Sequence, residues 1–255
     1  MSPTVSFTPL AGVPEVAVGD DLAELILTAA QRGGRSIDDD AIIVIAQKIV
    51  SKSEGRYVSL RTVTPSARAL ELADVTGKDP CLVELILAES SAVLRAAPGV
   101  LIVRHRLGYV MANAGIDRSN VPSDNDGERV LLLPLAPDRS AAEVRARMHR
   151  QAGVQPGVII SDSFGRPWRN GVVNVALGAA GVPTLIDRRG DKDRQGRRLE
   201  ITQVAFADAV CAGSALAMGE AAEGTPVVIV DGLRPRAPEC DARALIRPLE
   251  EDLFQ

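Results

Sequence analysis

The chain has 255 residues and a formal net charge of −4, and its side chains are 46% hydrophobic but only 3% aromatic. This length suits one large domain or two modest lobes. The acidic balance argues against nucleic acid or an anionic membrane surface as a partner. The composition excludes a disordered chain, and a core of Val, Ile, Leu and Ala favours strands covered by helices.

The cysteines and histidines exclude several kinds of site. Cys81, Cys211 and Cys240 are odd in number and widely spaced, which argues against a disulfide framework or a paired-cysteine metal site. We interpret Cys81 and Cys211 as core thiols. His105 and His149 lack zinc-site spacing, and we expect both at the surface. No apolar run is long enough to span a bilayer and no secretory leader is recognisable, so we expect a cytoplasmic protein.

Both strands and helices are expected along the chain. Hydrophobic patterns and capping residues predict both types of element. The expected strands lie at residues 5–10, 41–46, 100–103, 108–112, 131–134, 158–160, 182–186 and 226–230, and the expected helices follow Asp21, Ser66, Asp79 and the capping box at 140–143, with an alanine-rich helix at 204–218.

A polar stretch after the strand at 158–160 is the most informative part of the sequence. Asp162 and Ser163 supply hard oxygen ligands of the kind that Mg²⁺ and Mn²⁺ prefer. Arg166 and Arg169 can bind phosphate or carboxylate oxygens. Trp168 favours a functional site, because a bulky aromatic is costly to expose on an ordinary turn. The alternative is a tight turn with a surface ion pair.

Two further polar segments follow predicted strands. Lys48 and Lys52 come directly after the strand at 41–46 and could contact phosphate, although a solvated amine is the common alternative. Asp117 and Asn120 lie in a turn rich in oxygen ligands, which could equally be ordinary turn chemistry. A polar insertion at 123–129 follows this turn.

The usual catalytic motifs are missing. The sequence has no Walker A motif, no G-x-G-x-x-G and no nucleophile elbow. With only two histidines, catalysis would depend on carboxylates, metal ions and cationic side chains, which is typical of phosphoryl chemistry. The residues alone therefore predict a metal-dependent, phosphate-handling α/β protein.

Taken together, the polar segments resemble the coenzyme F-420-0:γ-glutamyl ligase family. The stretches that carry the resemblance run in family order over roughly residues 8–232, and they are 13–16 with 19–21, 46–52 with 54–56, 76–80, 112–117 with 119–121, 159–169 and 216–220. Agreement of several ordered motifs is far more specific than one short match.

The resemblance implies a mixed α+β fold of two interwoven lobes, with mixed sheets covered by helices. Residues 1–255 would form a single γ-glutamyl ligase unit without the reductase-like C-terminal domain of some relatives. The implied enzyme is a homodimer that uses GTP, two divalent ions (Mg²⁺ or Mn²⁺) and K⁺. GTP would phosphorylate the deazaflavin F-420 precursor, and L-glutamate would displace phosphate from the acyl phosphate to form a γ-linked amide.

The resemblance also assigns residues to the site. Asp117, Asp162, Ser163 and Glu220 would bind metal, although Ser163 stands where threonine is frequent. The residues expected at the GTP site are Val13, Pro14, Glu15, Val16, Gln47, Lys52, Asn120, Met218, Gly219, Ala221, Ala222, Glu223, Gly224 and Thr225. We add Lys48, Arg166 and Arg169 as catalytic cations that bind phosphate or carboxylate. Asp231 stands where arginine is expected, which makes an anion contact there doubtful.

Two other classes of function remain open. One is a metal-dependent nucleotide hydrolase or kinase that uses the same acidic and basic loops. The other is a non-catalytic nucleotide-binding homologue. Formation of product only when glutamate is supplied would separate the ligase from both alternatives.

Overall fold

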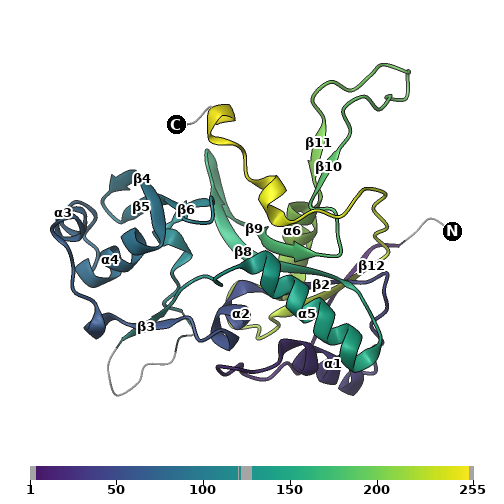
Figure 1. The fold of residues 1–255 in the computed structure, drawn as a ribbon, viewed down its shortest axis with the longest axis horizontal. Helices are drawn as coiled ribbons and strands as arrows, with labels where there is room; N and C mark the ends of the chain where they lie inside the picture. Colours follow the sequence, from purple (N-terminus) through teal and green to yellow (C-terminus); the bar gives the residue numbers. More distant parts are fainter. Residues whose placement is uncertain (1–3, 120, 122–127, 253–255) are drawn as a thin grey trace. The chain divides into compact units, whose positions relative to one another are not determined.

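The structure is a computed structural model in which residues 4–119, 121 and 128–252 are described. The chain divides into two compact units, each built from segments that are distant in the sequence. Unit 1 comprises Met1–Ser53, Ala136–Ser163 and Val173–Leu245, and unit 2 comprises Glu54–Leu135, Phe164–Val172 and Ile246–Gln255. Helices and sheets occur in both units (Figure 1), which confirms the predicted mixed α+β class.

A five-stranded mixed sheet forms the centre of unit 1. Its order is β1-β12-β2-β8-β9, with β2 parallel to β8 and with β12 antiparallel to both β1 and β2. The strands are β1 (Ser6–Pro9), β12 (Val227–Asp231), β2 (Ile42–Ala46), β8 (Gly157–Arg166) and β9 (Arg169–Ala180). The chain passes into unit 2 within β8 and returns within β9.

Helices cover both faces of this sheet. Ile42 and Val44 of β2 pack with Val210 and Cys211 of α6 (Phe206–Met218). The intervening residues of β2 point to the other face, as strand geometry requires, and are also fully buried. Across that face, α1 (Leu22–Arg32) and α5 (Pro137–Ala152) lie side by side (Figure 1). A strand buried on both faces accounts for the uninterrupted apolar run at residues 41–46.

The start of α5 differs from the prediction. The helix begins at Pro137 rather than at the expected capping box, because proline fits the first helical position and needs no hydrogen-bond acceptor for its nitrogen. Ser140 therefore lies inside the helix, where its hydroxyl donates to the carbonyl of Ala136 at 3.2 Å. A Cβ at Gly178 of β9 would meet the backbone of Pro137 at 2.2 Å, so this strand and helix touch through a residue that must be small.

The remaining elements of unit 1 are short. They are α2 (Gln47–Ser53), the 3-10 helix η3 (Ala242–Leu245), and a two-stranded hairpin of β10 (Leu185–Asp187) and β11 (Gln203–Ala205). The exposed loop of this hairpin contains ion pairs of Arg188 with Asp191 and of Arg189 with Asp187, in agreement with the mixed local charge of the sequence. Because β11 occupies residues 203–205, α6 begins two residues later than predicted.

The thiols differ in their surroundings. Cys211 is fully buried in unit 1, and burial raises the pKa of its thiol to about 12. Cys81 and Cys240 are partly buried and, like Cys211, are not in disulfides.

Within the described part of the chain, no helix has both the length and the apolar character needed to cross a membrane.

Unit 2 contains a three-stranded antiparallel sheet, β4-β5-β6, and a two-stranded sheet of β3 and β7. Its elements are β3 (Tyr57–Ser59), η1 (Leu60–Thr62), α3 (Ala67–Thr76), α4 (Pro80–Ala88), β4 (Ser90–Ala97), β5 (Val100–His105), β6 (Val110–Ala112), η2 (Asn113–Gly115), β7 (Arg129–Leu131) and η4 (Leu249–Glu251). Ser66 and Asp79 cap α3 and α4 as predicted. Leu72, Ile86 and Leu101 contribute to one core shared by the helices and strands.

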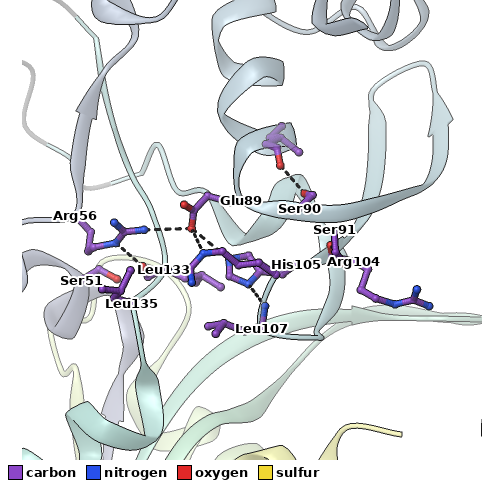
Figure 2. Close-up of polar contacts among 12 residues, drawn as sticks. Ser51, Arg56, Glu89, Ser90, Ser91, Arg104, His105, Leu107, Leu133 and Leu135 are labelled. Atoms are coloured by element: carbon purple, nitrogen blue, oxygen red, sulfur yellow. Dashed lines mark hydrogen bonds and ion pairs between the residues drawn. The ribbon is translucent and has the colours of Figure 1, made fainter. Parts of the chain in front are cut away.

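A partly buried carboxylate connects several segments of unit 2. Oε2 of Glu89, the residue after α4, lies 3.1 Å from Nη2 of Arg56, 3.2 Å from Nε of Arg106 and 3.4 Å from Nε2 of His105 (Figure 2). The backbone N–H of Leu107 donates to Nδ1 of His105 at 3.0 Å, so the imidazole proton is on Nε2 and faces Glu89. The expected surface position of His105 is wrong: its side chain is fully buried beside this acid.

This cluster stabilises the charged form of the acid. The contact with His105 is the largest cause, and the charges of Arg106 and Arg56 act in the same direction against the opposing effect of burial. Together they lower the pKa of Glu89 from 4.5 to about 2. The pKa of Glu89 is lower in the folded protein than in the unfolded chain. The contribution of its carboxylate to the free energy of unfolding is therefore fully present above about pH 4.5 and is lost as the pH falls towards 2.

We expect Glu89→Gln to weaken the acid dependence of folding. The variant will be less stable than the wild type at pH 7, and its unfolding free energy will fall less steeply between pH 4.5 and pH 2.5, because one depressed carboxylate no longer titrates. Urea unfolding followed by circular dichroism at several pH values measures both effects. Glu143→Gln, which removes an exposed partner of Arg139 on α5, is the control and should keep the wild-type slope. A wild-type slope in Glu89→Gln would contradict the assignment.

Candidate active site

Four predicted site segments of unit 1 start or end at one edge of its sheet. Pro9 of β1 lies opposite Val228, Val227 lies opposite Ile45, and Ala46 lies beside Ser161. The loop at 13–16 leaves this edge after β1, α2 starts there after β2, and the loop at 218–225 enters it before β12. Asp162 and Ser163 follow directly after the register pair of Ala46 and Ser161. The strand registers therefore bring these segments to a common edge.

A buried lysine lies in α2 at this edge. The Lys52 side chain is only 5% exposed and forms an ion pair with the carboxylate of Glu15, which is 77% exposed. One turn earlier, the buried Gln47 accepts a hydrogen bond from the Ser51 hydroxyl at 2.9 Å. Burial of a cation is costly without an anion beside it, so the surroundings of Lys52 favour a negatively charged partner. Two residues predicted for the nucleotide site are thus in direct contact.

The loop between α6 and β12 is held by its own polar groups. The Thr225 hydroxyl donates to the carbonyl of Met218 at 2.7 Å, and the Ala221 N–H donates to the Glu223 carboxylate at 2.8 Å. Gly219 ends α6 with a φ of 77°, a conformation that glycine adopts without strain. Glu220 follows it and is exposed. The predicted metal ligand is therefore accessible to solvent at the end of a helix.

The central polar motif lies within a strand rather than in a turn. β8 continues through Asp162 and Ser163, both partly buried, as far as Arg166. The turn comes only at Pro167 and Trp168, where Trp168 has a φ of 57° and is 82% exposed. The expected strand at 158–160 is therefore only the first part of β8, because the β8–β9 hairpin extends the strand through the polar residues.

The two arginines of this motif belong to the hairpin in unit 2. Nη2 of Arg166 donates to the carbonyl of Asn170 at 3.1 Å, so this guanidinium is partly engaged in holding the turn. Arg169 is exposed on β9. Their role as phosphate or carboxylate ligands remains a prediction, as does that of Lys48, which is partly buried on α2.

Asp117 also lies in unit 2. Its Oδ1 accepts hydrogen bonds from the N–H of Ser119 at 2.7 Å and from the Ser119 hydroxyl at 2.8 Å. Its backbone forms an isolated bridge with Leu131. Asn120 lies outside the described residues, as do residues 122–127 of the predicted insertion.

The donor set fits a hard divalent ion in its chemistry. Asp162, Ser163 and Glu220 provide carboxylate and hydroxyl oxygens, which suit Mg²⁺ or Mn²⁺ better than a soft metal. Among the described residues, no group of three or more His, Cys, Asp or Glu is close enough to form a complete metal site. The metal ligands therefore remain a prediction based on donor chemistry and on the resemblance.

Known proteins that share one name are similar to this chain over most of its length. Three similar proteins, each named coenzyme F420:L-glutamate ligase, come from Methanopyrus kandleri, Methanothermobacter thermautotrophicus and Haloarcula marismortui. The first is 46% identical over 99% of this chain and 98% of its own length, and the second 45% over 98% and 99%. The third is 44% identical over 86% of this chain and 84% of its own length.

These likenesses, together with a mixed α+β fold, define the chain as an enzyme of the ligase class. The family described as F420-0:Gamma-glutamyl ligase matches residues 12–232, which include every predicted site residue. The chain belongs to this family, and the resemblance inferred from the ordered motifs is confirmed.

The ion pair of Lys52 predicts an asymmetry between two substitutions. Glu15→Gln leaves a buried ammonium without its anion and should lower the unfolding free energy by about 1–3 kcal/mol. Lys52→Met removes the buried charge and keeps an apolar side chain of similar length, so its stability should remain within about 1 kcal/mol of the wild type. Urea unfolding at pH 7 measures both values. A larger loss in Lys52→Met than in Glu15→Gln would contradict this account of the pair.

Proposed function

We propose that this chain is a GTP-dependent ligase that adds L-glutamate, through γ-linked amide bonds, to the deazaflavin precursor of coenzyme F420. The observation that carries the proposal is the common sheet edge of unit 1, which gathers the segments of the buried Lys52, of Asp162 and Ser163, and of the 218–225 loop. Membership of the family supports the acceptor and the amino acid named here.

The chemistry requires two anions to approach one another. A carboxylate of the acceptor must attack the γ-phosphate of GTP, which breaks the bond from the γ-phosphorus to the β,γ-bridging oxygen and releases GDP. The acyl phosphate formed must then accept the amine of glutamate, with phosphate as the leaving group. Both reactants of the first step are negatively charged, so cations must neutralise them and hold them in line. A carboxylate alone reacts poorly with an amine, whereas an acyl phosphate carries a good leaving group.

The residues at the sheet edge suit this work. Lys52 would exchange its ion pair with the exposed Glu15 for a phosphate oxygen, because the buried ammonium requires an anion in either state. From the family resemblance, Asp162, Ser163 and Glu220 of unit 1 and Asp117 of unit 2 are each proposed as ligands of Mg²⁺ or Mn²⁺, which neutralises charge on the phosphates when bound. Lys48, Arg166 and Arg169 would orient phosphate or the acceptor carboxylate. A homodimer and a K⁺ ion are further parts of the proposal, drawn from the family resemblance.

Incubation with GTP, Mn²⁺, L-glutamate and the deazaflavin precursor should increase the mass of the acceptor by whole glutamyl residues, as measured by mass spectrometry. We expect Asp162→Asn to lower the rate by about 100-fold or more, because the metal loses a charged ligand. Asp74→Asn, on an exposed position of α3, is the matched control and should act as the wild type. GTP consumption without any gain in acceptor mass would reject the ligase in favour of a nucleotide hydrolase.

Lys52→Met should weaken binding of a non-hydrolysable GTP analogue about 10-fold or more, because the analogue loses a charge-assisted contact to a phosphate. Titration calorimetry measures this dissociation constant. Lys192→Met, which removes an exposed lysine from the β10–β11 loop, should bind the analogue as the wild type does. Equal affinity of the wild type and of a folded Lys52→Met protein would remove Lys52 from the nucleotide site.

A further inference from the structure

The position of Asp117 is set by its backbone. Its N–H donates to the carbonyl of Leu131 at 2.9 Å, and the N–H of Leu131 donates back to the carbonyl of Asp117 at 2.8 Å. Leu131 is in turn paired with Tyr57 of β3 on its other side. A shift of the segment at 131–133 would therefore move the backbone that carries the Asp117 carboxylate.

Arg56 holds that segment by two contacts. Its carbonyl accepts the N–H of Leu132 at 3.1 Å, and its side-chain Nε donates to the carbonyl of Leu133 at 2.9 Å. Arg56 directly precedes Tyr57, so the same short stretch of chain contacts three consecutive residues, 131 to 133. The guanidinium of Arg56 thus helps to fix the backbone of residues 131–133.

Glu89 fixes the guanidinium. Nη2 of Arg56 donates to Oε2 of Glu89 at 3.1 Å while Nε of the same group contacts Leu133 (Figure 2). The side chains of Arg56 and Glu89 are 20% and 14% exposed. Arg106 and His105 hold the carboxylate from other directions. An arginine fork can bind two acceptors at once in fixed geometry, which a lysine ammonium does less well.

We propose that Glu89 and Arg56 are positioning residues for Asp117. An unbroken series of contacts leads from the Glu89 carboxylate through Arg56 and the 131–133 segment to the Asp117 backbone, all within unit 2. The series keeps the Asp117 carboxylate in place before a divalent ion binds. The inference rests on the proposed function, in which Asp117 is a metal ligand, and it assigns a role to two residues outside the proposed metal and nucleotide ligands.

The test measures backbone protection and metal binding instead of turnover. In the metal-free protein, Glu89→Gln and Arg56→Lys should speed hydrogen exchange at the amides of Asp117 and Leu131, followed by NMR. Both variants should also weaken Mn²⁺ binding about 10-fold, as measured by electron paramagnetic resonance, in line with the effect of residues that orient metal ligands. Arg56→Lys keeps the charge beside Glu89 and so provides a folded test if Glu89→Gln unfolds.

Ile86→Val is the matched control, because it loosens the core that α4 shares with Leu132 but removes none of the polar contacts of Glu89 and Arg56. It should leave both measurements unchanged. Wild-type exchange and wild-type Mn²⁺ affinity in Glu89→Gln and Arg56→Lys would overturn the proposal, as would equal effects in Ile86→Val. Asp117→Asn separates the metal role of Asp117 from the positioning role of Glu89 and Arg56. Unchanged Mn²⁺ affinity in Asp117→Asn would refute the metal role. Weakened Mn²⁺ binding in Asp117→Asn with wild-type binding in Glu89→Gln would refute the positioning role alone.

Discussion

The parallel pairing of β2 with β8 is the constraint on which the candidate site depends. Parallel strands run in the same direction, so the last residue of β2, Ala46, lies beside Ser161 of β8, and the polar residues that follow both positions are brought to the same edge of the sheet. The antiparallel strand β12 begins where β2 ends and thereby delivers the 218–225 loop to that edge. A register slip of one residue would turn Asp162 to the opposite face of its strand, so the apolar pattern of the core also fixes the orientation of the polar residues.

Much of this arrangement could be predicted from the sequence. The buried strands, the caps at Asp21, Ser66 and Asp79, and the mixed α+β class follow from local patterns that the tertiary structure leaves intact. The family also followed from the residues, because polar motifs of restricted spacing tolerate few alternatives. Which segments share a sheet edge could not be predicted from pattern alone, since strand order is a property of the whole chain.

Three positions show what a local stretch of sequence does not reveal. Trp168 is exposed at a hairpin turn, because the strand continues past the polar residues and places the ring beyond the core. His105 was expected at the surface, yet its ring is fully buried beside Glu89, to which the neighbouring Arg106 also binds. Glu89 itself follows a helix, a position at which an acid is ordinarily solvated. Its role becomes visible only in the folded structure, because its partners Arg56, His105 and Arg106 are distant from it in the sequence.

The Cys211 thiol has a practical consequence for following the protein in solution. Because the side chain is fully inaccessible and its pKa is raised to about 12, the sulfur is almost entirely in the unreactive protonated form at neutral pH. An alkylating reagent can reach it only when α6 separates from the sheet. The rate at which Cys211 is alkylated, compared with the rates of the more accessible Cys81 and Cys240, therefore measures how often α6 separates from the sheet.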